Sequence, residues 1–202
     1  MKNTKLVITD EVIYVEDNPR QVVMDKGSKG LMELYSIIVT QNKGKILDVG
    51  FGMGFSADKI YELTNNYTCI EINYEIFKKA LKWSEGKPNT NIYFGDWTKI
   101  IKQMNLRGMK FDGIFMDTYN DPNHNDFEKY ASTISNEGCI LSMFNYSACR
   151  DKNTMNSISF NLSGNRFKKN IENYHLVNWT IFNEGKFIKT NDKFKTTQNK
   201  II

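Results

Sequence analysis

Cysteine, histidine and proline are scarce in this chain of 202 residues, with three, two and three copies. The cysteines, at positions 69, 139 and 149, are odd in number and show no metal-ligand spacing. They predict neither a disulfide framework nor, with only two histidines, a zinc site, and we expect no metal. Cys69 and Cys139 fall in apolar runs, where a free thiol packs as a small hydrophobe. We therefore expect a reduced, cytoplasmic protein.

The sequence also lacks long apolar runs and a strong charge of one sign. No stretch approaches the ~20 apolar residues of a membrane-spanning helix. The first residues lack the continuous apolar core of a signal peptide. The net charge of +4 is a mild excess, and the lysines are spread rather than gathered into the basic stripe typical of nucleic-acid binders. We therefore expect neither a membrane nor a nucleic-acid partner.

The order of the predicted elements indicates the fold class. Apolar and polar residues alternate over 5–15, which predicts a short hairpin. Helical patterns then alternate with short apolar runs. The expected helices cover 28–41, 53–65, 74–84, 97–106 and 125–135, with a mixed, partly helical region over 147–170. The expected strands cover 45–49, 67–72, 91–94, 111–116, 138–144, 174–182 and 185–196.

Strands that alternate with helices predict an α/β fold: a Rossmann-like, seven-stranded, mostly parallel sheet with helices on both faces. The turn over residues 183–185 predicts that the last two strands form an antiparallel hairpin at the C-terminal edge. We find no linker and no internal repeat. We therefore expect a single domain over 1–202, with an N-terminal hairpin or lid segment at 1–27 and the Rossmann-like core at 28–202.

A glycine-rich loop, DVGFGMG over 48–54, follows one predicted strand and opens a helix. Gly50 and Gly52 allow the backbone to turn tightly and to lie against a ligand. A dinucleotide-binding loop has the spacing G-x-G-x-x-G, because its pyrophosphate sits on the helix N-terminus. Here the third glycine, Gly54, comes one residue earlier, which favours a ligand without phosphate such as S-adenosylmethionine. Asp48 is placed to bond the methionine part of that ligand, directly or through water.

Two further strand ends carry acidic residues in register with this loop. Glu71 ends the second strand, about 20 residues beyond the loop, where a carboxylate accepts ribose hydroxyls. Asp96 and Trp97 follow the third strand, where they suit an adenine amino group and ring. Asp96 is also a plausible N-cap of the following helix. Because ligands bind beyond the carboxyl ends of parallel strands, the three positions together predict a cofactor site.

Asp117 ends the fourth strand and is expected at the same edge of the sheet, beside the cofactor. Asp25 precedes the first helix and could fold over that edge. Two carboxylates facing one pocket suit a cationic acceptor such as a guanidinium group.

At this point the sequence resembles the family of guanidinoacetate N-methyltransferase and the fungal arginine δ-N-methyltransferases. The similar stretches are VVMDKGSKGLM (22–32), ILDVGFGMG (46–54), CIEINYEIFKKALKW (69–83), FGDW (94–97) and FDGIFMDTY (111–119). The glycine loop alone identifies only a superfamily, and its combination with FDGIFMDTY is more specific.

The resemblance implies a methyltransferase that uses S-adenosylmethionine and acts on a guanidino group of a small compound, of arginine or of peptidyl arginine. It assigns the cofactor to Asp48, Gly50, Gly52, Gly54, Glu71, Ile72, Asp96, Trp97 and Asp117. It assigns the acceptor to Asp25, Thr118, Tyr119 and Asn145, with Asp117 and Asp25 as the catalytic pair. The family carries Glu where this chain has Asp25, and it continues with Trp-Glu-Thr where this chain has KGS at 26–28.

Other functions stay open from the sequence alone. A metal-dependent O-methyltransferase would need an acidic cluster after the fifth strand, where the chain reads FNYS. An adenine-modifying nucleic-acid methyltransferase is only faintly echoed by DPNH at 121–124. The remaining alternatives are a methyltransferase for another small acceptor and a protein that binds the cofactor without turnover. The subunit number is also open, with a homodimer among the choices.

Overall fold

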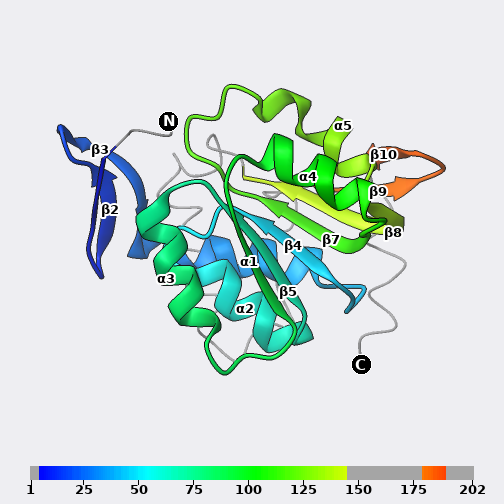
Figure 1. Cartoon of the computed structure of the whole chain (residues 1–202), viewed down its shortest axis with the longest axis horizontal. Helices are drawn as coiled ribbons and strands as arrows, with labels where there is room; N and C mark the ends of the chain where they lie inside the picture. The colour runs from blue at the N-terminus through cyan, green and yellow to red at the C-terminus, as the bar shows by residue number, and fades with distance from the viewer. Residues whose placement is uncertain (1–4, 145–178, 190–202) are drawn as a thin grey trace.

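The computed structural model describes residues 5–144 and 179–189, which form two sheets (Figure 1). The main sheet has seven strands in the order β10-β9-β8-β7-β4-β5-β6. Strands β4 to β8 pair in parallel, and β9 and β10 pair antiparallel at one edge. The strands are β4 (Ile46–Val49), β5 (Tyr67–Glu71), β6 (Thr90–Phe94), β7 (Phe111–Met116), β8 (Ser135–Met143), β9 (Trp179–Asn183) and β10 (Lys186–Lys189). The predicted fold class, including the C-terminal hairpin, is confirmed.

Helices cover both faces of this sheet because its strands are apolar on both sides. One face carries α1 (Lys29–Val39), α2 (Phe55–Thr64) and α3 (Tyr74–Ser84), and the other carries α4 (Trp97–Leu106) and α5 (Phe127–Ser132). Along β4, Ile46 packs with the first group of helices and Leu47 with the second. This alternation is the period of two expected of a strand that is buried on both faces.

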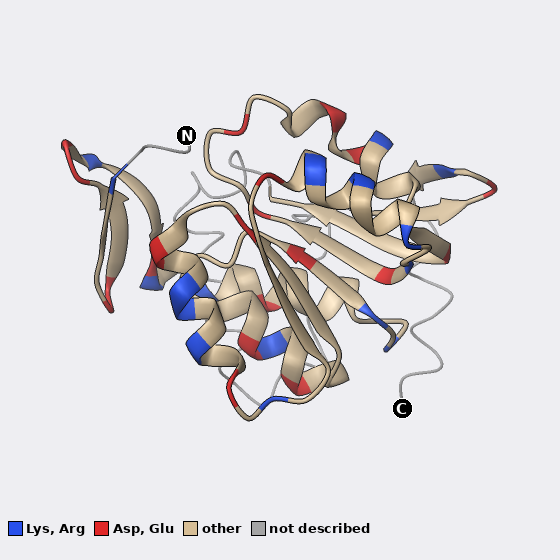
Figure 2. Ribbon diagram, viewed as in Figure 1, with Lys and Arg blue, Asp and Glu red and all other residues tan. Residues whose placement is uncertain are grey.

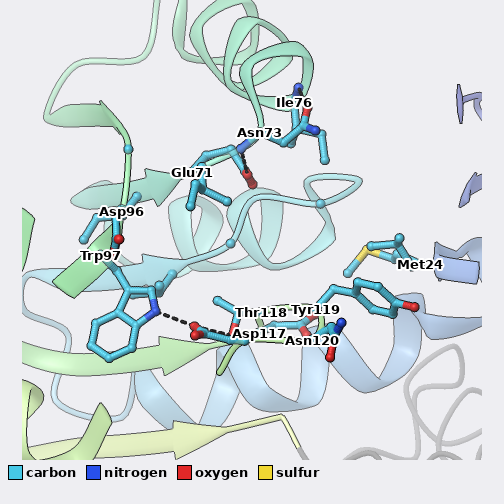
Figure 3. Close-up of a pocket in the computed structure, with 18 of the residues that line it drawn as sticks. Met24, Glu71, Asn73, Ile76, Asp96, Trp97, Asp117, Thr118, Tyr119 and Asn120 are labelled. Carbon is cyan, nitrogen blue, oxygen red and sulfur yellow. Dashed lines mark hydrogen bonds between the residues drawn. The ribbon is translucent and has the colours of Figure 1, made fainter. Parts of the chain in front are cut away.

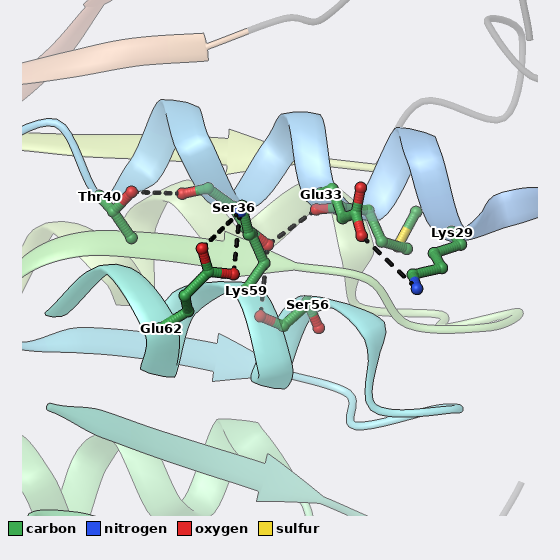
Figure 4. Close-up of polar contacts among 8 residues, drawn as sticks. Lys29, Glu33, Ser36, Thr40, Ser56, Lys59 and Glu62 are labelled. Carbon is green, nitrogen blue, oxygen red and sulfur yellow. Dashed lines mark hydrogen bonds and ion pairs between the residues drawn. The ribbon is translucent and has the colours of Figure 1, made fainter. Parts of the chain in front are cut away.

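The hydroxyl group of Ser36 links α1 to α2 (Figure 4). The Ser36 Oγ donates to the carbonyl oxygen of Met32 at 2.7 Å and lies 3.3 Å from that of Ser56. The Thr40 Oγ1 donates in turn to the Ser36 carbonyl at 2.7 Å. Since Ser56 lies in the first turn of α2, this contact also fixes the end of the loop that precedes the helix.

A second sheet, which the sequence predicted only in part, packs against the hydrophobic cluster that includes α1, α2 and α3. It consists of β1 (Leu6–Ile8), β2 (Val12–Val15) and β3 (Asn18–Asp25), all antiparallel. The prediction of a two-stranded hairpin was incomplete because β3 has no regular alternation. Its register against β2 shifts twice, and Val23 is an extra residue between the pairs made by its neighbours. Such a bulge places two adjacent apolar residues where a regular strand would alternate.

Two other predicted boundaries were wrong. The helix expected over 125–135 is a 3-10 turn, η2 (His124–Asp126), followed by α5, which ends at Ser132. Strand β8 begins three residues earlier than expected, because a bulge near Gly138, at φ +81°, hides the start of its pattern. The region 147–170 and parts of the last two predicted strands lie outside the described residues.

Cys69 and Cys139 are fully buried, as expected. Of the helices that the structure describes, none has both the length and the apolar character to cross a bilayer.

Gly113 in β7 allows α1 to seat directly on the sheet. A Cβ atom at this position would lie 1.9 Å from the carbonyl oxygen of Val39, at the end of α1. Because a backbone atom cannot rotate away, we expect Gly113→Ala to lower the free energy of unfolding by about 3 kcal/mol or more, measured by urea denaturation. Gly86→Ala is the control, since its Cβ would meet nothing within 4 Å and only the backbone at φ +72° is strained, at about 1–2 kcal/mol. Equal losses in the two variants would contradict this packing.

Candidate cofactor and acceptor site

A pocket opens at the carboxyl ends of the central strands (Figure 3). Its volume of about 390 Å³ lies within the roughly 300–1,000 Å³ typical of ligand pockets. Its wall includes nine of the residues predicted from the sequence: Gly50, Gly52, Glu71, Ile72, Asp96, Trp97, Asp117, Thr118 and Tyr119. The structure therefore gathers most of the predicted site around one cavity.

The glycine loop forms the floor of the pocket, which two of its three left-handed glycines line. Gly50 has φ +101°, and a Cβ there would lie 2.0 Å from the carbonyl oxygen of Asp117. Gly52 has φ +53°, and its Cβ would lie 2.8 Å from the Sδ and Cε atoms of Met24. Gly54 is the left-handed N-cap of α2 and does not line the pocket. Two glycines thus shape the surface, while the third starts the helix.

Asp48 lies beneath the loop rather than in the pocket wall. Its Oδ2 accepts hydrogen bonds from Ser56 Oγ at 2.7 Å and from Tyr67 Oη at 2.8 Å. Its Oδ1 is buried and has no partner among the described residues. Burial raises the pKa of Asp48 to about 7, although both hydrogen bonds act to lower it. In this structure the carboxyl group ties β4 to β5 and to the start of α2.

Glu71 joins the glycine loop to the turn after β5. Its Oε2 accepts from the backbone N–H of Phe51 at 2.9 Å, and its Oε1 accepts from that of Asn73 at 2.7 Å. Burial raises the pKa of Glu71, while these backbone hydrogen bonds act to lower it. An ionised carboxylate offers about four acceptor sites, so Glu71 can accept from a ligand as well as hold the loop.

Asp96 and Trp97 form the wall beyond β6. Asp96 caps α4, because its Oδ1 accepts from the backbone N–H of Thr98 at 2.9 Å. The Trp97 ring is 5% exposed and packs edge-on against Phe127 and Tyr130, with ring centroids 5.0 and 5.1 Å away. Both residues line the pocket, so the capping role of Asp96 is compatible with a place in the site.

Asp117 lies at the centre of the pocket wall, directly after β7 (Figure 3). Its backbone N–H donates to the carbonyl oxygen of Val49 at 2.9 Å, which fixes it beside the glycine loop. Within residues 5–144 and 179–189, its carboxylate has neither a hydrogen bond nor an ion pair. Burial, and then the negative charge of Glu71, raise its pKa to about 7. An unpaired carboxylate in a partly buried position is arranged to receive a cation or a proton.

The structure does not bring Asp25 into this pocket. Asp25 is exposed at the end of β3, where its Oδ1 lies 3.4 Å from the Ser28 hydroxyl. Its neighbours Val23 and Met24 line the pocket instead, and the Sδ of Met24 accepts from the backbone N–H of Met53 at 3.3 Å. Asn145 lies outside the described residues. The roles of Asp25 and Asn145 in acceptor binding therefore stay predictions.

Several lining residues were missed from the sequence, among them Met24, Asn73, Ile76, Asn120 and Asp121. Asn73 could have been found, because it follows a predicted strand and caps the next helix through its side chain. Counting these additions, the part of the lining that lies in residues 5–144 and 179–189 holds four carboxylates, at positions 71, 96, 117 and 121, and no Lys, Arg or His. Lysines lie along α3 and α4 instead (Figure 2). The pocket thus favours cations over phosphates.

The model of the guanidinoacetate N-methyltransferase family matches residues 10–152, more than half of the chain. The chain belongs to this family. The methyltransferases of this family use S-adenosylmethionine, so the predicted family and cofactor are confirmed.

This member of the guanidinoacetate N-methyltransferase family is similar to two proteins named protein arginine N-methyltransferase 2. The one from Candida glabrata is 30% identical over 155 residues, which are 71% of this chain and 37% of that protein. The one from Aspergillus oryzae is 28% identical over 113 residues, which are 54% of this chain and 25% of that protein. The chain thus spans well under half the length of these relatives.

Solved methyltransferase structures are similar in fold to this member of the guanidinoacetate N-methyltransferase family. The O-methyltransferase TomG from Streptomyces achromogenes, in complex with SAM, has a TM-score of 0.51 at 17% identity, covering 64% of this chain and 65% of that one. An O-methyltransferase from Bacillus cereus, in complex with SAH, has a TM-score of 0.51 at 17% identity, covering 72% and 67%. At these identities the likeness concerns the methyltransferase fold alone.

The raised pKa values predict how stability depends on pH. Asp48 and Asp117 have pKa values of about 7 in the folded chain against an ordinary value of 3.8. The folded chain therefore binds more protons than the unfolded chain between about pH 4 and pH 7. We expect the free energy of unfolding of the cofactor-free chain to fall as the pH rises through this window and to stay low above it.

Asp117→Asn removes one of three carboxyl groups whose pKa is raised, the others being those of Asp48 and Glu71, without removing a hydrogen bond, and it should make this fall smaller. Urea denaturation at pH 5 and at pH 8 measures the fall in each protein. An identical fall in the wild type and the variant would show that the Asp117 carboxyl does not titrate in this window.

Proposed function

We propose that the chain transfers a methyl group from S-adenosylmethionine to a nitrogen of a guanidino group, with Asp117 as the acceptor-binding carboxylate. The observation that carries this proposal is the unpaired Asp117 carboxylate, placed in the wall of a pocket whose lining, among the described residues, carries acidic but no basic side chains. A guanidinium group is a planar cation whose N–H donors match a carboxylate. Family membership and the arginine methyltransferase relatives support the same acceptor class.

The pocket fits the cofactor in three respects. The glycine loop lines the pocket at Gly50 and Gly52, where only backbone can lie because a Cβ atom would collide with the Asp117 carbonyl or with Met24. Acidic lining without basic residues suits a cofactor that carries a sulfonium and no phosphate. The carboxylate of Glu71 has lone pairs left for ribose hydroxyls, and Ile72, Asp96 and Trp97 would contact the adenine. Asp48, and Gly54 at the start of α2, would act mainly by holding the loop in shape.

Asp117 would orient the acceptor and remove a proton during transfer. When bound, S-adenosylmethionine supplies an electrophilic methyl group on a positively charged sulfur. A guanidinium beside Asp117 lowers the pKa of the carboxyl group and keeps it ionised. When the acceptor nitrogen is methylated it would lose one proton, which the Asp117 carboxylate would accept. Thr118 and Tyr119, next along the chain, would contact the acceptor from the same wall.

Asp25 is proposed as the second contact of the guanidino group. Because it is exposed in this structure, that contact requires β3 to move toward Asp117 when the acceptor binds. Asn145 is proposed on the acceptor side from the family resemblance alone. A single domain, a cytoplasmic location, a homodimer and the lack of a nucleic-acid partner likewise stay predictions.

Transfer of an isotopically labelled methyl group to guanidinoacetate, free arginine and an arginine-containing peptide tests the proposal, with mass spectrometry of the products. We expect a labelled product on at least one guanidino nitrogen. Cofactor binding by calorimetry together with no product from any of the three would favour a protein that binds the cofactor without turnover. Transfer of the labelled methyl group to an oxygen of catechol, in a parallel reaction, would favour an O-methyltransferase instead.

Asp117→Asn should keep binding of S-adenosylhomocysteine within about threefold of wild type and lower kcat by roughly 10²–10⁴-fold, since the variant cannot accept the proton. Asp112→Asn is the matched control at the other end of β7. There the carboxylate accepts from the Lys45 backbone N–H at 2.8 Å and from Asn136 Nδ2 at 2.7 Å, away from the pocket. We expect the control to lose stability but to keep its turnover. Near wild-type turnover in Asp117→Asn would rule out the assigned role.

A further inference from the structure

Asp121 connects the two walls of the pocket through its carboxylate, which neither the sequence pattern nor the family assigns to the site. Its Oδ2 accepts hydrogen bonds from the indole N–H of Trp97 and, at 3.2 Å, from the hydroxyl of Thr118. Its Oδ1 accepts from the backbone N–H of Asn123 at 2.9 Å. One side chain therefore contacts the wall beyond β6 and the loop after β7.

The loop that presents Asp121 turns sharply after Asp117. Asn120 has φ +49°, a left-handed conformation in which residues other than glycine are uncommon. This turn brings Asp121 back to Thr118, three residues earlier, so that the segment between them closes on itself. Since Thr118 directly follows Asp117, the Asp121 carboxylate also restrains the direction in which Asp117 leaves the sheet.

The Trp97 ring cannot rotate to find another acceptor. It is wedged against Phe127 and Tyr130 and is almost fully buried. A buried indole N–H without an acceptor is costly, so the bond to Asp121 fixes both the tilt of the ring and the position of the loop.

We propose that Asp121 is a positioning residue that holds Trp97 and Thr118 in the arrangement required for cofactor binding. This inference rests on the proposed function, because it takes the pocket to be the S-adenosylmethionine site. The carboxylate is required rather than an amide, since the indole N–H of Trp97 and the backbone N–H of Asn123 can only donate, and they contact different oxygens of Asp121. An Asn side chain has one acceptor oxygen, so its NH₂ group would face either the Trp97 indole N–H or the Asn123 N–H.

Calorimetry of S-adenosylhomocysteine binding to the full chain tests the proposal. We expect Asp121→Asn to weaken binding about tenfold. Asp112→Asn is the matched control, because it also replaces a partly buried aspartate that accepts from one backbone N–H and from a side-chain N–H. It should destabilise the chain while leaving this affinity unchanged.

A second readout separates positioning from general destabilisation. In ¹H–¹⁵N spectra, the Trp97 indole N–H signal, assigned by its loss in Trp97→Phe, should shift in Asp121→Asn and stay in place in Asp112→Asn. The double variant Trp97→Phe/Asp121→Asn should also lose affinity by a smaller factor than the product of the two single losses, because both substitutions remove the same hydrogen bond.

The outcomes distinguish the two levels of the proposal. If the wild-type chain does not bind S-adenosylhomocysteine, the proposed function fails before Asp121 is considered. If the wild type binds it and Asp121→Asn binds equally well with an unshifted Trp97 signal, the positioning role is overturned while the proposed function stands.

Discussion

The placement of buried carboxyl groups beneath one edge of the sheet is the constraint on which the site depends. Asp48, Glu71 and Asp117 end or nearly end three adjacent strands, and burial raises the pKa of each. The fold stabilises two of them with hydrogen bonds that also shape the glycine loop. It leaves Asp117 without a partner among the described residues, so a cationic ligand is the natural complement of this edge.

The N-terminal sheet contributes residues of its irregular strand β3 to the pocket at the same edge. The bulge in β3 shifts its register, and Val23 and Met24 consequently line the pocket while Asp25 faces solvent. Met24 then packs on Gly52, where a side chain would collide with it. The cofactor loop and the N-terminal sheet are thus fitted to each other, and a shift of β3 would alter both the floor and the rim of the pocket.

Much of the fold and part of the site could be predicted because their signals are local. The boundaries of α3, α4 and β7 follow from short periodic patterns, and the spacing of three glycines is enough to identify the cofactor loop. Strand β3 and the start of β8 were missed, since bulges break the alternation on which such predictions rest. Asp121 was missed for another reason: its partner Trp97 begins α4, 24 residues away in the chain, and no spacing marks a contact between the two.

The sequence by itself determined the order of strands and helices, the glycine loop and the acidic residue at the end of each central strand, because these depend on residues close together in the chain. Only the tertiary structure decided which of those acids face the pocket. Asp117 does, Asp48 is turned beneath the loop to Ser56 and Tyr67, and Asp25 points away. The direction of a side chain at a strand end is set by the neighbours packed around it, and those neighbours come from distant parts of the chain.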